Sequence, residues 1–181
     1  MFAVGCLVAV GVMRKILAIL SLALASGCAP QTHSILDAAG VFRTNQAVFS
    51  SIRATYPGPY DGFMRIPARD PADEKPRDTS FLQLVREDIP VAFLDFFPIE
   101  DADADEIDVV LWRELTNDRL TTTSLIYFSR DMTLDDAHEH MRVFDVCNQE
   151  VADWIDETKA EGPTAAFCKV STRWYAYQRV E

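Results

Sequence analysis

The chain has 181 residues, of which 28 are acidic and 17 are basic, and its formal net charge is −11 at pH 7. An acidic surface repels phosphate backbones, so nucleic acid is not an expected partner. The sequence contains no glycine-rich phosphate loop, no GxSxG elbow and no HExxH motif. We therefore expect no cofactor, and the common enzyme signatures are absent.

The N-terminal segment has the organisation of a secretory signal. Arg14 and Lys15 form a short positive region, residues 16–24 are apolar, and small residues precede Cys28. If the first 27 residues formed one membrane helix instead, the two cations would lie near its middle, at a cost of roughly 2.5–3.5 kcal/mol each. We expect translation to start at Met13, with residues 1–12 as an extension ahead of the signal.

Residues 13–28 resemble the signal peptide of bacterial lipoproteins, in which a small residue precedes the cysteine that becomes the lipidated N-terminus. Three residues before that cysteine, this chain has Ala25 where the family usually has leucine. The resemblance implies removal of residues 1–27, acylation of Cys28 (palmitate or a similar chain) and export to the periplasmic face of a membrane. Ala29 stands where inner-membrane lipoproteins often carry aspartate, which favours the outer membrane.

The cysteine count bears on the alternative way of processing the signal. Ordinary cleavage after residues 23–25 (ALA) would leave a soluble exported chain with three cysteines. Acylation of Cys28 leaves only Cys147 and Cys168, an even number suited to one disulfide. We predict that these two cysteines form a structural disulfide, because the CxxC spacing of redox-active pairs is absent.

Two main helices and a short one over residues 80–88 are predicted in the mature chain, which we divide into a tether over residues 28–33 and one globular domain over 34–181. Ser34 can cap the first helix, which ends near residues 56–59 (YPGP). The second starts at Thr133, where Asp136 has capping-box spacing, and closes at residues 162–163. The side chains expected on the buried faces are Ile35, Ala38, Phe42, Phe49 and Ile52 in the first helix, and Ala137, Met141, Phe144, Val151, Trp154 and Ile155 in the second.

Strand-like segments rich in aromatic and β-branched residues occupy 89–97, 107–115, 120–130 and 164–180, and residues 116–119 suit a hairpin turn. Residues 63–66 are a candidate short strand, and residues 67–79 read as a charged loop. No segment between the first three long strands can hold a crossover helix, which favours antiparallel pairing. The pattern predicts an α+β domain, with an antiparallel sheet of four to five strands and two main helices packed on one face.

Two groups of residues are candidate metal ligands. Asp101, Asp103 and Asp105 alternate like the first ligands of a calcium loop, but Glu106 and Trp112 stand where an EF-hand needs glycine and glutamate. We interpret this segment as an acidic, solvated hairpin loop, with a weak calcium site as the alternative. His138 and His140 would point about 200° apart on a helix, so they cannot share one ion. No metal site is therefore expected from the histidines.

Two further features are candidates for function. Asp95 lies between Phe93 and Phe97 on one strand face, and we expect it to pair with an arginine such as Arg113. The last strand places a basic and aromatic stripe on one face, which is a candidate binding surface, with ordinary cross-strand pairing as the alternative. Its members are Lys169, Arg173, Tyr175, Tyr177 and Arg179.

These features together predict a lipid-anchored protein of the bacterial cell envelope that acts as a binding or assembly module. Its expected partners are the membrane, through the lipid, and other envelope proteins. The alternatives are an exported domain that binds a small ligand or calcium, and a hydrolase whose carboxylates come together only on folding.

Overall fold

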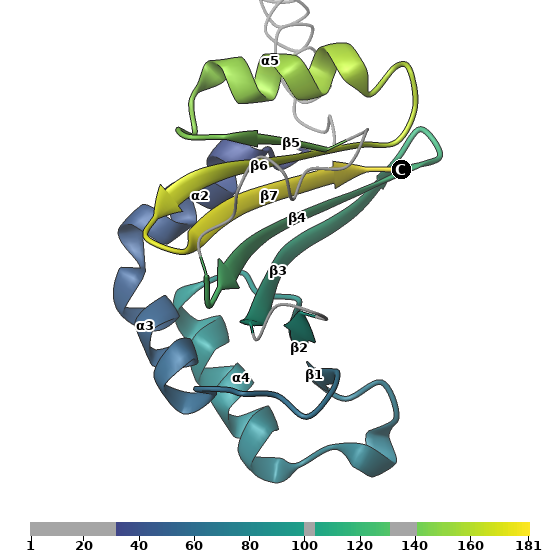
Figure 1. Cartoon of the computed structure of the whole chain (residues 1–181). Helices are drawn as coiled ribbons and strands as arrows, with labels where there is room; N and C mark the ends of the chain where they lie inside the picture. The colour runs from purple at the N-terminus through teal and green to yellow at the C-terminus, as the bar shows by residue number, and fades with distance from the viewer. Residues whose placement is uncertain (1–31, 100–103, 131–140) are drawn as a thin grey trace, which may run out of the picture. The chain divides into compact units, whose positions relative to one another are not determined.

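The computed structural model describes residues 32–99, 104–130 and 141–181, and it gathers His33–Glu181 into one compact unit. Within the described ranges the unit contains four α-helices, one short 3-10 helix and seven strands (Figure 1). The helices are α2 (Ile35–Thr44), α3 (Gln46–Thr55), α4 (Pro76–Asp88) and α5 (Gln149–Thr158), with the 3-10 helix η1 at Pro71–Asp73. The strands are β1 (Met64–Ile66), β2 (Phe93–Ile99), β3 (Ala104–Thr116), β4 (Arg119–Phe128), β5 (Met141–Phe144), β6 (Thr164–Ser171) and β7 (Trp174–Val180).

All seven strands belong to one sheet, in the order β1-β2-β3-β4-β7-β6-β5. Every neighbouring pair is antiparallel except β5 and β6, which are parallel and are connected through α5. The α+β class is therefore confirmed, but the predicted antiparallel sheet of four to five strands is too small and lacks the parallel pair. The last segment, 164–180, is two strands joined by a tight turn, and β5 was not expected at all.

The second predicted helix is wrong over residues 141–148. Met141 and Phe144 lie on strand β5, and the helix that follows, α5, begins only at Gln149. Cys147 accordingly lies in the loop before α5 and not on a helix. The spacing of the apolar residues suited a helix, but Phe144 packs on Trp154 from a strand, with ring centroids 5.8 Å apart. Residues 133–140, including His138 and His140, lie outside the described residues.

The first predicted helix begins where expected and divides into two. The Ser34 side chain accepts from the Asp37 backbone N–H while the Asp37 carboxylate accepts from the Ser34 backbone, so the capping box is complete. Asn45 then interrupts the helix, and its side-chain amide donates to the Val41 carbonyl at 3.0 Å. The break separates α2, which packs on the sheet, from α3.

The described helices bury their apolar side chains against one face of the sheet. The buried residues of all four, from Ile35 on α2 to Ile155 on α5, belong to a single hydrophobic cluster with that face of the strands. At its centre the rings of Phe42, Phe49 and Trp174 contact one another at 5.1–5.7 Å. The opposite strand face, which none of the described helices covers and which we call the helix-free face, carries a smaller cluster that includes Ile126, Phe128, Phe167 and Tyr175.

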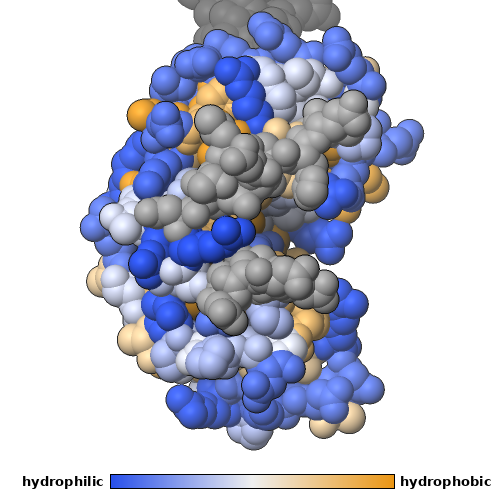
Figure 2. Space-filling model, in the orientation of Figure 1, coloured by the Kyte–Doolittle hydropathy of each residue, from blue (hydrophilic) through white to orange (hydrophobic). Residues whose placement is uncertain are grey.

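A disulfide joins Cys147 to Cys168 and ties the loop before α5 to strand β6. The predicted pairing is therefore present. None of the helices in the described ranges is long and apolar enough to cross a membrane. Figure 2 shows that the visible surface of the described residues is mostly hydrophilic, with apolar side chains in small separate areas. The large apolar residues that are exposed are Phe63, Leu84, Leu115 and Val146.

Candidate functional site

The register of the sheet aligns charged side chains in one row across the helix-free face. Arg65 on β1 is opposite Asp95 on β2, and Asp95 is opposite Asp108 on β3. The row continues through Ile126 on β4 to Tyr175 on β7. Glu106, two residues before Asp108, lies on the same face. Three carboxylates from β2 and β3 therefore meet beside a single arginine.

Arg65 forms an ion pair with one of these carboxylates, Asp95. Arg65 Nε donates to Asp95 Oδ1 at 2.6 Å, and Nη2 donates to Oδ2, so the pair is bidentate. The guanidinium also lies over the Phe93 ring, 4.1 Å from its centroid. Asp95 is buried. The expectation of an arginine partner for Asp95 was correct, but the partner is Arg65 and not Arg113, which pairs in register with Thr122.

Glu106 and Asp108 form the unpaired part of the row, and we call them the acidic pair. No ion pair to a basic side chain is found for either among the residues that the structure describes. Burial raises the pKa of Glu106 to about 8, and the charges of Asp108 and Asp95 add to the increase. Burial also raises the pKa of Asp108 to about 7; Ser124 and Arg65 oppose that rise while Asp95 adds to it. At neutral pH the acidic pair therefore holds a proton on one or both carboxyls.

A buried hydroxyl lies beside the acidic pair. Ser124 on β4 is fully buried, and it is opposite Val110, the next residue on the same face after Asp108. Its Oγ and the Oδ1 of Asp108 are both inaccessible to solvent and have no partner in hydrogen-bond geometry, although the hydroxyl is close enough to lower the pKa of that carboxyl. The two groups lie beside each other, and a small rotation of the side chains would let the hydroxyl donate to the carboxylate.

Aromatic rings surround the acidic pair. Glu106 is flanked across the strands by Phe97 on β2 and Phe128 on β4. Tyr177 is opposite Ser124, and its pKa is raised to about 12 by burial, with Asp108 and Glu106 among the lesser causes and Arg179 opposing them. Carboxylates among aromatic faces are a good environment for an organic cation, because the ring quadrupole and the negative charge both attract it.

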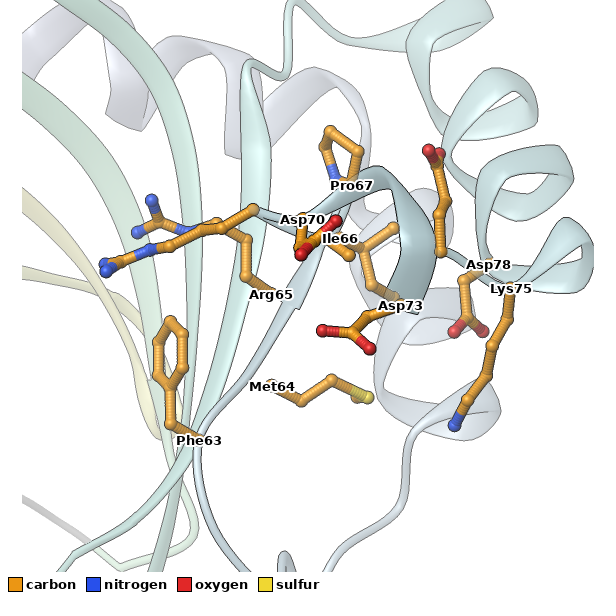
Figure 3. A pocket seen from close by; sticks show the side chains of 12 residues that line it. Phe63, Met64, Arg65, Ile66, Pro67, Asp70, Asp73, Lys75 and Asp78 are labelled. Carbon is orange, nitrogen blue, oxygen red and sulfur yellow. The ribbon is translucent and has the colours of Figure 1, made fainter.

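A pocket of about 340 Å³ lies at the β1 edge of the sheet (Figure 3). Phe63 and Arg65 lie on one side of it, and Asp73, Lys75 and Asp78 on the other. Part of its polar lining is engaged within the fold, since Asp78 accepts from the Tyr56 hydroxyl at 2.8 Å and Glu74 from the Thr79 hydroxyl at 2.6 Å. Neither Glu106 nor Asp108 lines this pocket.

The predicted calcium ligands are only partly described. Asp105 lies on β3, where its Oδ1 accepts from the Tyr60 backbone N–H at 3.2 Å. Asp101 and Asp103 lie outside the described residues. Within the described ranges, no three His, Cys, Asp or Glu side chains are arranged to hold a metal ion. The acidic segment is also no simple solvated loop, because its end forms β3 and contributes Glu106 and Asp108 to the helix-free face.

The basic and aromatic stripe is distributed over two strands and a turn. Lys169 on β6 and Tyr175, Tyr177 and Arg179 on β7 share the helix-free face, whereas Arg173 lies in the turn with φ 65°. Tyr175 is buried in the smaller cluster, and Arg179 pairs with Glu181 at 2.6 Å. The alternation was predicted correctly for Lys169, Tyr175, Tyr177 and Arg179, which lie along the same face as the acidic pair, and wrongly for Arg173.

Sequence reasoning singled out Asp95 but missed Arg65, Glu106, Asp108 and Ser124. The alternation of charged and apolar residues at 106–109 was a signal that Glu106 and Asp108 share one strand face. Cys28 lies outside the described residues, so its lipidation stays a prediction. No family model, no curated protein and no solved structure matches the chain.

Proposed function

We propose that the protein is a lipid-anchored binding module of the bacterial cell envelope, whose helix-free face receives a basic side chain of a partner protein at the acidic pair. The observation that carries the proposal is the pair itself: two half-buried carboxyls that have no basic partner among the described residues, next to the fully buried Ser124 hydroxyl. Export and anchoring through Cys28 are inferred from the signal-like segment at residues 13–28.

The stability cost of the acidic pair supports a functional role. A buried carboxyl that lacks partners destabilises the folded state, and an apolar side chain of similar size at the same place would be less costly. Asp95 shows that this sheet can neutralise an acid with an arginine from the next strand. Glu106 and Asp108 have no such arginine among the described residues. A partner protein that supplies the positive charge would explain why these two carboxyls are retained.

Lysine and arginine have the chemistry that this place requires. Their apolar stems can pack on Phe97 and Phe128, the cross-strand neighbours of Glu106. Their cationic ends can donate to the Asp108 carboxylate and to the Ser124 hydroxyl. An arriving cation favours the ionised carboxylates, so binding must release protons at neutral pH, and the affinity must rise as the pH approaches 8.

The other functions considered from the sequence have less support. A hydrolase needs two acids at a cleft that admits substrate, but the pocket at the β1 edge is not lined by Glu106 or Asp108. A calcium site has no set of three ligands in the described part of the chain. The binding module therefore accounts for more of the observed geometry.

The acidic pair can be tested with two small probes, N-acetyl-lysine methylamide and N-acetyl-arginine methylamide, titrated into the mature protein while its amide NMR spectrum is followed. We expect saturable shifts confined to β2, β3, β4 and β7, with at least fivefold tighter binding at pH 8 than at pH 6. The variants Glu106→Gln and Asp108→Asn should lose these shifts. Glu157→Gln, which removes one exposed charge from α5, should keep them.

Shifts that are scattered over the whole acidic surface, or that persist equally in Glu106→Gln, would show that the probes bind only by net charge. The anchor has a separate test, the intact mass of the protein extracted from its own membranes. We expect a chain that begins at Cys28 and is heavier by its acyl groups. A lipid-free chain beginning at Ser26 would contradict the anchor and leave a soluble exported protein.

A further inference from the structure

The first residue of the compact unit is fixed firmly to the sheet. The His33 ring stacks on Trp112 with centroids 4.1 Å apart and planes 6° apart. Its backbone N–H donates to Glu114 Oε2 at 2.9 Å, and its ring Nδ1 lies 2.7 Å from Oε1. Its carbonyl accepts from the Gln178 side-chain amide at 3.0 Å. The chain therefore enters the domain at a defined place, beside the second half of β3.

That place is close in sequence to the proposed lipid. Four residues lie between Cys28 and His33, so the two positions are five residue steps apart. A fully extended chain of this length reaches roughly 17–18 Å. If Cys28 carries the lipid, the surface around His33 must stay within that distance of the membrane-bound residue. The part of the domain that faces the bilayer is then set by what surrounds His33.

The neighbouring feature is the tip of the hairpin between β3 and β4, residues 113–120. Asn117 and Asp118 both have positive φ, 51° and 62°, as a tight two-residue hairpin turn requires. Strand β2 pairs with β3 only up to Val110, so β3 beyond this point has β4 as its only strand neighbour. The hairpin tip is therefore a narrow, two-stranded projection that ends in a defined turn.

The side chains on the hairpin tip suit a lipid surface. Leu115 is 73% exposed, the highest value among the exposed large apolar residues, and its cross-strand partner is Leu120. Arg113 is exposed, Arg119 is half-buried, and neither has an ion pair within the described ranges. Two acids lie nearby. Glu114 accepts a hydrogen bond from the His33 backbone N–H, so Asp118 is the acid that remains close to the two arginines in sequence. The hairpin tip of this strongly acidic protein therefore combines an exposed leucine, Leu115, with two arginines that have no ion pair within the described ranges.

We propose that the hairpin tip is a membrane-contact surface, in which Leu115 enters the headgroup region and Arg113 and Arg119 contact phospholipid phosphates. The inference rests on the proposed lipid anchor. One leucine and two arginines do not hold a protein on a bilayer from free solution, but an anchor five residues from His33 keeps the tip at high effective concentration near the lipid. The tip therefore sets the orientation of the domain, and the lipid holds it there.

This orientation leaves the acidic pair available to a partner. Glu106 and Asp108 lie seven to nine residues from Leu115 along β3, roughly 23–30 Å at 3.3 Å per residue. With the hairpin tip on the bilayer, the acidic pair lies away from the membrane surface. The two proposals are thus compatible, although they use different residues and can fail separately.

The test uses the mature chain from Cys28, coupled through that thiol to a maleimide phospholipid in phosphatidylcholine vesicles with one quarter phosphatidylglycerol. The photocrosslinking amino acid p-benzoylphenylalanine replaces Leu115 in one protein and Val146 in another; Val146, exposed to 60%, precedes α5. We expect at least fivefold more crosslinking to lipid from position 115 than from position 146. Arg113→Gln with Arg119→Gln should reduce it, and Arg77→Gln with Arg86→Gln on α4 should not.

Equal lipid crosslinking from both positions, or none from position 115, would overturn the membrane-contact surface. Because the maleimide lipid supplies the anchor, this result does not depend on whether the natural chain is acylated, which the intact mass decides. Native acylation without crosslinking from position 115 contradicts the hairpin proposal alone. Crosslinking from position 115 with no native acyl group would leave the contact surface standing and remove the anchor.

Discussion

Arg65 and Asp95 face each other across strands β1 and β2, and the guanidinium donates to both oxygens of the carboxylate. This bidentate pair fixes the edge strand β1, which has only three residues, to the rest of the sheet. It also decides which of the three acids on the helix-free face is neutralised. Asp95 is compensated within the domain, and Glu106 and Asp108 are not.

The first prediction concerns this pair. Arg65→Met should destabilise the domain by about 3 kcal/mol, because it leaves a buried carboxylate unpaired next to Asp108. Urea unfolding monitored by circular dichroism measures the loss. Arg69→Met is the matched control, since Arg69 stacks on the exposed Phe63 ring at 5.4 Å, and its loss should cost under about 1 kcal/mol.

Adding Asp95→Leu to Arg65→Met should recover most of the lost stability, because it removes the buried charge itself. Similar losses for Arg65→Met and Arg69→Met would contradict this account. So would a double variant that is no more stable than Arg65→Met alone.

The second prediction concerns Gly58, which has φ 66°. A Cβ at this position would lie 2.3 Å from Asp105 Oδ2, and Asp105 is held in place by its bond to the Tyr60 N–H. Gly58→Ala should therefore cost about 2–3 kcal/mol, from backbone strain and the displaced carboxylate together. Gly40→Ala on α2 meets nothing within 4 Å and should stabilise the domain by up to about 1 kcal/mol. Thermal unfolding of the two variants should shift in opposite directions; a common direction would contradict the geometry.

The third prediction concerns the disulfide. Cys147 and Cys168 close a loop of 21 residues that contains all of α5. Replacing both with alanine should lower the free energy of unfolding by about 3 kcal/mol in the chain-entropy model. Urea unfolding with and without a reducing agent measures this, and the reducing agent should have no further effect on the double variant. A native protein that is equally stable in both conditions would show that the crosslink contributes little.

The sequence was informative where structure is local. Ser34 and Asp37 form a capping box from residues three apart, residues 116–119 form the expected hairpin, and strand alternation placed Tyr175 and Tyr177 on one face. Each depends on a few neighbouring residues. Apolar spacing could not separate helix from strand at Met141 and Phe144, because the parallel pairing of β5 with β6 is a tertiary interaction that overrode the helical period.

The candidate site was harder to predict, because it depends on register between distant strands. Arg65 and Asp95 are 30 residues apart, and only the pairing of β1 with β2 brings them together. The prediction of Arg113 as the partner was reasonable by proximity in sequence, but Arg113 follows a register shift in β3 and lies opposite Thr122. The raised pKa values of Glu106 and Asp108 come mainly from burial, which no spacing of charges reveals.

The last prediction concerns the pH dependence of stability. Glu106 has a pKa of about 8 in the folded chain against an ordinary value of 4.5. Between these two values the folded chain keeps a proton that the unfolded chain has lost, so the free energy of unfolding falls as the pH rises from 4.5 to 8. Glu106→Gln cannot ionise and should lack this part of the fall. At pH 9 it should be more stable than the natural chain by on the order of 2–4 kcal/mol, after allowance for partial exposure.

Urea unfolding at pH 5, 7 and 9 measures the difference, which should be small at pH 5 and grow with pH. Glu157→Gln, which removes an exposed carboxylate on α5, should give a curve parallel to that of the natural chain. Parallel curves for Glu106→Gln would mean that Glu106 is fully solvated and cannot serve as a proton-linked site. If the gap instead closes when the lysine probe is added at pH 9, the cation offsets the same buried charge that the substitution removes, which ties the stability cost of Glu106 to the binding proposed for it.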